Sequence, residues 1–126
     1  MSGHEPPHPT PVVLVVDDHA DTREMYATFL GAMGIETLQA TTCAEALATM
    51  PSRAIDVVVL DRRLPDGDGA DVARALKADA RTHAVAVIVL SGQPAGDGSA
   101  ADVYLLKPVI PDTLYDEIQR LLAGRR

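Results

Sequence analysis

A carboxylate at the end of an apolar run is the first feature of this sequence that could do chemistry. Val57 to Leu60 are all apolar and lead directly into Asp61. Pro65, Gly67 and Gly69 follow shortly afterwards and favour a turn. A short apolar run bounded by turn residues is typical of a strand buried on both faces of a parallel sheet. We therefore expect Asp61 to lie at the rim of the core, where a strand ends.

Other apolar runs also lead into residues with useful chemistry. Ligands of doubly wound parallel sheets gather at the carboxyl ends of the strands, which share one edge of the sheet. Side chains at those ends are therefore expected to lie close together. With Asp61, the residues that end or follow these runs are Asp17, Asp18, Ser91 and Lys107.

The three acids of this set predict a metal site. Carboxylates at one edge repel one another, so one of them takes up a proton unless a cation lies among them. Mg²⁺ fits, since it takes oxygen ligands and commonly uses one or two carboxylates with a phosphate oxygen. A metal held there leaves an oxygen of Asp61 free to attack phosphorus and form an aspartyl phosphate. Lys107 then offers a positive charge, and Ser91 a hydroxyl, to the phosphoryl oxygens.

Each of these residues has a simpler explanation when it is taken alone. Asp17, Asp18 and Ser91 could cap helices, Asp61 could be a turn residue, and Lys107 could be a solvated lysine. Their coincidence at four strand ends favours a functional site.

The elements that must position these residues alternate between strand and helix. Almost purely apolar strands call for a parallel sheet covered on both faces by right-handed crossovers, so a single doubly wound α/β sandwich is predicted. The expected strands cover residues 12–16, 35–40, 57–61, 84–90 and 102–106, and the expected helices cover 21–33, 42–50, 70–80 and 111–122. Thr42 is the expected cap of the second helix, Pro51 its end, Gly34 the stop of the first helix and Pro111 the opening of the last.

The fourth crossover departs from this alternation. Residues 92–101 contain Gly92, Pro94, Gly96 and Gly98. Glycine costs roughly 1 kcal/mol relative to alanine inside a helix, and proline costs more. We therefore predict no regular helix here, with at most one turn at residues 99–101.

Composition and charge set the broad class. The chain has 126 residues, enough for one domain, with a flexible Pro-rich tail expected at residues 1–11 and one domain at 12–126. The net charge of −7 argues against a nucleic-acid or membrane partner. Cys43 is the only cysteine and is expected to be small core filler, and no apolar run approaches the roughly 18 residues of a membrane span. A cytoplasmic protein is predicted.

Four motifs together resemble the receiver domain of two-component response regulators, of the kind found in chemotaxis regulators. The resemblance covers residues 12–122 and implies a flavodoxin-like (βα)5 fold with a five-stranded parallel sheet, here with the fourth helix missing or shortened. The motifs are V-V-D-D at 15–18, V-V-V-L-D-R-R-L-P-D-G-D-G at 57–69, V-I-V-L-S-G at 87–92 and Y-L-L-K-P at 104–108.

The resemblance also implies a role for each site residue. Asp61 is the phosphoacceptor, Ser91 and Lys107 contact the phosphoryl group, and the Lys107–Pro108 peptide is cis. The implied Mg²⁺ ligands are Asp17, Asp18, Asp61 and the backbone carbonyl of Arg63. Ser91 and Tyr104 correspond to the family's switch pair, although Tyr104 could equally be a strand-edge tyrosine that shields the core.

Two departures from the family stand out. Lys107 follows Ser91 by 16 positions, which is shorter than the family spacing and again predicts a missing or reduced fourth helix. Because the family uses the face around that helix for dimerisation or partner binding, a remodelled or different signalling face is expected, and a homodimer is left open. Arg62 and Arg63 follow the acceptor; Arg63 and Gln93 flank the water path and are candidates for setting the rate of dephosphorylation. Arg63 could pair with the acids of the site or screen the acyl phosphate from water, or it could instead face solvent, as is expected of Arg62. His19 follows the acid pair and could be taken for a metal ligand, but it is expected to face solvent.

The predicted function is a phosphorylation-dependent signalling switch. Asp61 accepts a phosphoryl group from a histidine kinase or histidine phosphotransfer protein, and a surface bound by an unknown downstream protein then changes. The chain catalyses its own phosphorylation and dephosphorylation but turns over no separate substrate, so it is not an enzyme in the usual sense. The alternative is a receiver-like binding module that acts without phosphorylation. Two enzyme or carrier classes are disfavoured. A phosphohydrolase needs a second acid two residues after the nucleophile, where Arg63 stands, and a flavin carrier needs a phosphate-binding loop after the first strand, where Asp17 and Asp18 lie.

Overall fold

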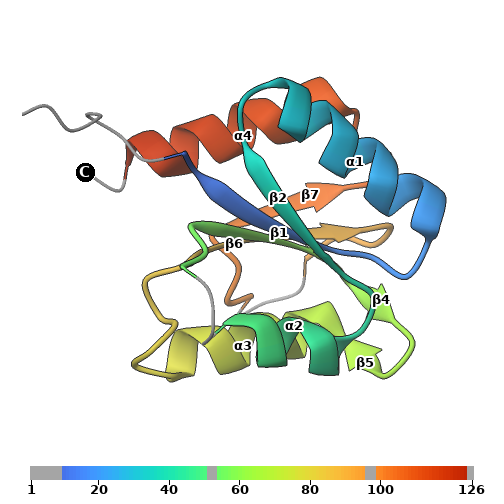
Figure 1. The fold of residues 1–126 in the computed structure, drawn as a ribbon. Coiled ribbons are helices and arrows are strands. Elements are labelled where there is room, and N and C mark those ends of the chain that lie inside the picture. The colour runs from blue at the N-terminus through green and yellow to red at the C-terminus, as the bar shows by residue number, and fades with distance from the viewer. Residues whose placement is uncertain (1–9, 51–53, 96–98, 125–126) are drawn as a thin grey trace, which may run out of the picture.

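The computed structural model describes residues 10–50, 54–95 and 99–124, which form a parallel five-stranded sheet between two layers of helices (Figure 1). The strand order is β2-β1-β3-β6-β7, and every neighbouring pair in this sheet is parallel. The predicted doubly wound sandwich is therefore confirmed. The strands are β1 (Val12–Val16), β2 (Glu36–Ala40), β3 (Val57–Asp61), β6 (Ala86–Ser91) and β7 (Val103–Leu106).

Helices cover both faces of the sheet, which explains why its central strands are apolar throughout. The helices α1 (Ala20–Ala32) and α4 (Pro111–Ala123) lie on one face, and α2 (Cys43–Thr49) and α3 (Gly69–Ala78) lie on the other (Figure 1). Side chains alternate along each strand, so that in β3 Val59 packs toward α1 and α4 while Val58 packs toward α2 and α3. The side chains of β3 on both faces of the sheet are fully buried.

Local signals set the helix ends within one or two residues of the predicted bounds. The Thr42 hydroxyl caps α2 by accepting a hydrogen bond from the Glu45 amide at 3.0 Å, and Asp68 caps α3 through the Ala70 amide at 2.8 Å. Gly34 follows α1 with a φ of 88°, a conformation that favours glycine. Residues 1–9 of the predicted tail, the predicted helix end at Pro51, and Gly96 and Gly98 lie outside the described residues.

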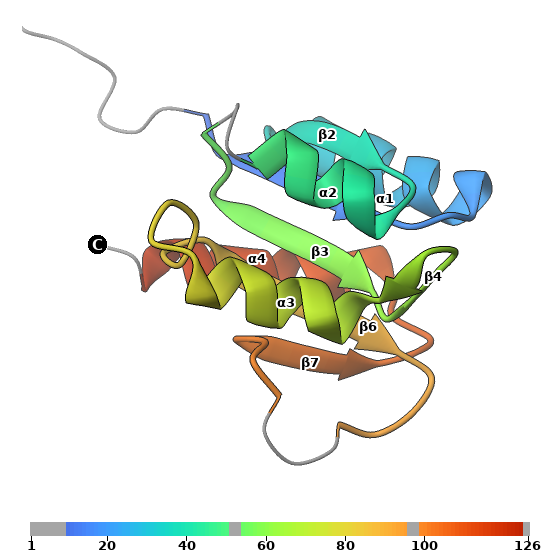
Figure 2. The same ribbon diagram turned by 90° about the horizontal axis from the view of Figure 1, so that it is seen from below.

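The connection between β6 and β7 has no helix in its described parts, residues 92–95 and 99–102, as predicted. Figure 2 shows it leaving β6 and returning to β7 at the edge of the sheet. Asp102 holds the end of this connection, just before β7, against the sheet. Its carboxylate accepts hydrogen bonds from the Val87 amide at 2.7 Å and from Lys77 Nζ at 2.8 Å. Leu106 of β7 is left exposed.

The connection between β3 and α3 holds a small hairpin that was not predicted. It pairs β4 (Arg63–Leu64) with β5 (Gly67–Asp68) in antiparallel fashion. At its turn, the Asp66 carboxylate accepts hydrogen bonds from the amides of Cys43 at 2.8 Å and Ala44 at 3.0 Å. The hairpin is thereby tied to the first turn of α2.

Candidate functional site

The carboxyl ends of four adjacent strands carry the predicted site residues. Asp17 directly follows β1, Asp61 ends β3, Ser91 ends β6, and Lys107 directly follows β7. The strand register sets Asp61 opposite Leu90, and Ser91 opposite Leu106. The sheet thus brings these side chains to one edge, which is where parallel α/β sheets bind ligands.

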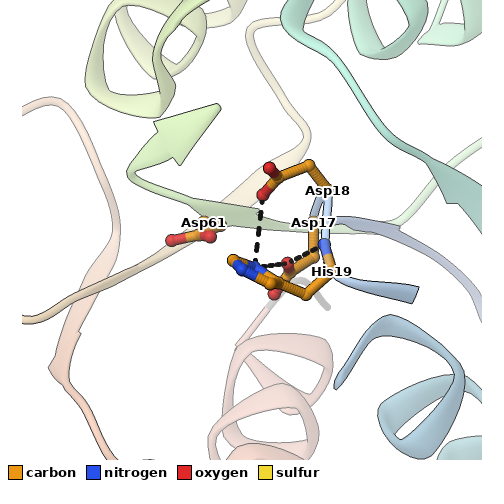
Figure 3. Close-up of side chains that lie close together, drawn as sticks. All are labelled: Asp17, Asp18, His19 and Asp61. Atoms are coloured by element: carbon orange, nitrogen blue, oxygen red, sulfur yellow. Dashed lines mark hydrogen bonds and ion pairs between the residues drawn. The ribbon is translucent and has the colours of Figure 1, made fainter. Parts of the chain in front are cut away.

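The acids lie close together, with His19 beside them. One oxygen from each of Asp17, Asp18 and Asp61 and a ring nitrogen of His19 all lie within 4.8 Å of one another (Figure 3). Asp17 and Asp61 are only 3% and 2% exposed, whereas Asp18 is exposed. The His19 side chain is 75% exposed, but its Nδ1 is 3.4 Å from an oxygen of Asp17 and 3.4 Å from one of Asp18. His19 is therefore solvent-exposed, as expected, but its ring also lies beside both carboxylates.

Lys107 is the cation at the centre of the site. Its Nζ is 2.8 Å from Asp61 Oδ1, and its amide donates a hydrogen bond to the carbonyl of Ser91 at 2.8 Å. The peptide bond from Lys107 to Pro108 is cis. The Arg63 amide points to the same Asp61 oxygen at a long 3.4 Å. Among the described residues, nothing pairs with the second oxygen of Asp61.

This arrangement fits a divalent cation. Asp17 uses Oδ1 to accept the His19 amide at 2.8 Å, and its other oxygen has no partner in the described chain. Two buried carboxylates therefore each keep an oxygen for a further ligand, and Lys107 alone does not balance three acids. Carboxylate oxygen is the ligand that Mg²⁺ prefers.

A pocket of about 870 Å³ opens beside Asp61 on the side of β6 and β7. Ser91, only 3% exposed, borders it, and its Oγ accepts a hydrogen bond from the Gln93 amide at 3.0 Å. The hydroxyl hydrogen remains available to donate. The charged and polar residues that line the pocket include Asp61, Arg62, Arg63, Asp68, Gln93 and Lys107. Three cations around one carboxylate suit a pocket that receives an anionic group.

Arg62 and Tyr104 form a link that the sequence did not indicate. The Tyr104 hydroxyl accepts a hydrogen bond from Arg62 Nη1 at 3.0 Å and donates one to the Gln93 carbonyl at 2.9 Å. Arg62 Nε also lies 3.2 Å from the Asp68 carboxylate. Hydrogen bonds to Tyr104 and then to Asp68 raise the pKa of Arg62. The solvent-facing placement expected for Arg62 is therefore wrong.

Arg63 and Tyr26 complete the surroundings. Arg63 is exposed, and its guanidinium has no hydrogen-bond or ion-pair partner within the described ranges, so it does not hold the site's acids.

On the α1 side of the site, the buried Tyr26 hydroxyl donates a hydrogen bond to the Val109 carbonyl at 2.6 Å. Burial first, and then the charges of Asp17 and Asp61, raise the pKa of Tyr26. No signal in the sequence indicated this contact of Tyr26 beside the site.

Comparison with known proteins identifies the class. Residues 13–119 match the response regulator receiver domain. The phosphate regulon transcriptional regulatory protein PhoB of Pseudomonas aeruginosa is 34% identical over 116 residues, covering 87% of this chain and 51% of that protein. The DNA-binding response regulator MtrA of Mycobacterium tuberculosis is 34% identical over 119 residues, covering 87% of this chain and 50% of that protein.

Solved structures agree in fold. A CheY-like response regulator receiver domain protein from Methanospirillum hungatei superposes with a TM-score of 0.83 at 25% identity, covering 93% of this chain and 97% of that one. Response regulator protein TrrA from Thermotoga maritima, in complex with Mg²⁺-BeF, has a TM-score of 0.81 at 30% identity, covering 89% and 99%. This chain belongs to the response regulator receiver domain family. As a receiver domain it is a phosphorylation-dependent signalling switch of two-component systems, and domains of this family are not classical enzymes.

The comparisons correct one prediction. The exclusion of nucleic acid as a partner is wrong for this class, because MtrA is a DNA-binding response regulator. The chain spans about half the length of the curated relatives it matches. The net charge of −7 describes this chain and does not report on what those longer relatives bind. As for membranes, none of the helices in the described ranges is long and apolar enough to span a bilayer.

Proposed function

We propose that Asp61 is the phosphoacceptor of this switch. The observation that carries the proposal is the state of its carboxylate, which is 2% exposed, bound to Lys107 through one oxygen and without a protein partner among the described residues on the other. A buried carboxylate that borders an open pocket is placed to act as a nucleophile toward a group entering that pocket.

We further propose that Mg²⁺ is held by Asp17, Asp18 and Asp61 together with the backbone carbonyl of Arg63. The clustered oxygens support the side-chain part of this set. The relative TrrA is in complex with Mg²⁺-BeF, which supports Mg²⁺ as the ion. When bound, the ion offsets the charge of the acids and of the phosphoryl oxygens.

The residues of the chain then have defined tasks. One oxygen of Asp61 attacks the phosphorus of a phosphohistidine on a histidine kinase or phosphotransfer protein; an O–P bond forms, the P–N bond breaks, and its electron pair remains on the imidazole. The Lys107 ammonium and the Ser91 hydroxyl donate hydrogen bonds to the phosphoryl oxygens. In a separate step, water attacks the phosphorus of the aspartyl phosphate; the P–O bond to Asp61 breaks, inorganic phosphate leaves, and the carboxylate is regenerated. The chain therefore acts only on its own phosphoryl group and turns over no separate substrate.

Ser91 also connects the phosphoryl group to the surface. Its Oγ accepts from the Gln93 amide, and the Gln93 carbonyl accepts from the Tyr104 hydroxyl. A shift of Ser91 toward a phosphoryl group would draw on this chain and release the Tyr104 ring, so Ser91 and Tyr104 act as the switch pair. The edge of the sheet at β7, where Leu106 is exposed, then presents a changed surface to a downstream protein. We assign this function to a domain of residues 12–126 and place it in the cytoplasm.

The experiment is an intact-mass measurement after treatment with phosphoramidate or acetyl phosphate, with and without Mg²⁺. We expect one phosphoryl adduct in the wild type only with Mg²⁺, none in Asp61→Asn, and a normal adduct in Asp116→Asn, which removes an exposed acid of α4. Failure of both donors to modify the wild type, or an adduct that persists in Asp61→Asn, would overturn the assignment of Asp61.

A further inference from the structure

We propose that His19 is a fourth side-chain ligand of the divalent-ion site, and that its imidazole gives the site a preference for late first-row ions such as Co²⁺ over Mg²⁺. The inference rests on the proposed function, because it concerns the ion site formed by Asp17, Asp18 and Asp61. It adds a nitrogen ligand to a site otherwise made of oxygen.

The distances around His19 are those of neighbouring ligands on one ion. Two atoms bound at about 2.1 Å and separated by 90–110° lie roughly 3.0–3.4 Å apart. His19 Nδ1 is 3.4 Å from Asp18 Oδ1, which fits two neighbouring ligands. It is also 3.4 Å from Asp17 Oδ1, which accepts the His19 amide, so the ring lies beside the carboxylate whose other oxygen is left for an ion. Opposite ligands of an octahedron lie about 4.2 Å apart, and all four atoms of the cluster fall within 4.8 Å.

The imidazole is available for this role. Both separations from the carboxylates exceed the usual hydrogen-bond range of about 2.7–3.2 Å, so neither acid holds the ring in a hydrogen bond. Figure 3 shows the ring between the carboxylates of Asp17 and Asp18 and on the side of Asp61. The second ring nitrogen has no partner in the described chain. A small turn of an exposed side chain is enough to aim Nδ1 at an ion.

The backbone of His19 is already fixed. Its amide donates to Asp17 Oδ1 at 2.8 Å, and its carbonyl accepts the Arg23 amide at 2.9 Å as the N-cap of α1. A pocket of about 510 Å³ on the α1 side is lined by His19 and Asp17 together with Tyr26 and Lys107, and it leaves the ring room to move. A preorganised backbone that carries an exposed ring lowers the cost of recruiting the ligand on binding.

Ligand chemistry then sets the preference. Mg²⁺ favours oxygen and gains little from an imidazole, whereas Co²⁺, Ni²⁺ and Zn²⁺ bind imidazole nitrogen well. The loss of His19 should therefore weaken Co²⁺ much more than Mg²⁺. The carboxylate oxygens of Asp17 and Asp61 bind Co²⁺ and Mg²⁺ alike, so they do not discriminate between the two ions.

The test compares Co²⁺ and Mg²⁺ binding by calorimetry at constant pH in the full chain, its His19→Ala variant and a triple variant, His4→Ala/His8→Ala/His83→Ala, which leaves His19 as the only histidine. Proton NMR of the Co²⁺ form provides a second readout, since a coordinated imidazole N–H gives a strongly shifted exchangeable resonance. We expect the ratio of Co²⁺ to Mg²⁺ affinity to fall about tenfold or more in His19→Ala, with loss of that resonance. The triple variant should keep both.

The outcomes separate this inference from the proposed function. If Mg²⁺ binding is lost in Asp61→Asn but the affinity ratio and the shifted resonance are unchanged in His19→Ala, the role of His19 is wrong and the acidic site stands. If neither ion needs Asp61, the ion site itself is wrong, and the inference falls with it.

Discussion

The guanidinium of Arg62 donates a hydrogen bond to the hydroxyl of Tyr104 at 3.0 Å, across 42 positions of the chain. Arg62 directly follows Asp61, and Tyr104 lies in the edge strand β7. The same guanidinium pairs with Asp68, the cap of α3. The position of the Tyr104 ring is thus coupled to the connection that carries the proposed phosphoacceptor.

Removal of the Arg62 side chain should loosen the Tyr104 ring. In Arg62→Ala the hydroxyl keeps only its hydrogen bond to the Gln93 carbonyl. We expect the Tyr104 signal in ¹⁹F NMR of fluorotyrosine-labelled protein to shift toward a solvent-exposed value. Arg74→Ala, which removes an exposed arginine of α3, should leave it in place. A Tyr104 signal that is the same in Arg62→Ala and the wild type would show that the hydrogen bond does not position the ring.

The Arg63 side chain should lengthen the lifetime of the phosphoryl group. It borders the pocket beside Asp61 and is not held by another described residue, so it is free to cover an acyl phosphate against water. We expect phosphate release from Arg63→Ala to be several times faster than from the wild type, as followed by intact mass over time. Gln93→Ala tests the other flank of the same path. Equal decay rates for Arg63→Ala, Arg74→Ala and the wild type would exclude the shielding role.

Gly69 should tolerate no side chain. A Cβ at this position would lie 2.4 Å from the Asp61 carbonyl oxygen and 3.2 Å from Arg62 Cα, both of which belong to the backbone. Gly69→Ala should lower the free energy of unfolding by about 3 kcal/mol and displace the strand end that carries Asp61. Urea unfolding provides the measurement.

Gly31→Ala in α1 is the matched control, because no atom lies within 4 Å of its added Cβ. It should raise the free energy of unfolding by about 0.5–1 kcal/mol. Equal effects of the two substitutions would contradict the steric argument.

Cys43 should react slowly with thiol reagents at moderately alkaline pH. Burial first, and then its hydrogen bond with Asp66, raise the pKa of its thiol from 9.0 to about 11. Because the folded pKa lies above the unfolded one, stability is retained below pH 9 and declines as the pH rises from about 9 to about 11. Alkylation by iodoacetamide should show its midpoint near pH 11 in the native state and near pH 9 in urea. A native midpoint near 9 would contradict this.

The strands and the gathering of site residues were predictable because one physical rule connects them. Buried parallel strands appear as apolar runs, and parallel strands deliver their ends to the same edge. Asp61, Ser91 and Lys107 could therefore be brought together without knowledge of the fold's details. The lack of a helix in the described parts of residues 92–101 followed from glycine and proline in the same way.

Other contacts had no sequence signal. The bonds from Arg62 to Tyr104, from Asp66 to the start of α2 and from Tyr26 to Val109 join side chains to distant partners, and they depend on tertiary geometry rather than on spacing. The hairpin of β4 and β5 has two residues per strand, too short to show a period of two. The expectation that Arg62 faces solvent failed because its partners, Tyr104 and Asp68, are brought to it by the fold. The sequence around Arg62 does not show which residues these partners are.

The alignment of β3 with β6 has a consequence for variation within the core. Side chains alternate between the two faces of a strand, so a slip of one residue in this pairing would bring Ser91 to the position now held by Leu90, opposite Asp61. The hydroxyl would then leave the rim and enter the α1–α4 core, while every distance within β6 stayed the same. Substitutions deep in the sheet, far from any acid, can therefore abolish signalling if they shift the ladder. The positions of Asp61 and Ser91 relative to each other therefore depend on the backbone register of β3 and β6.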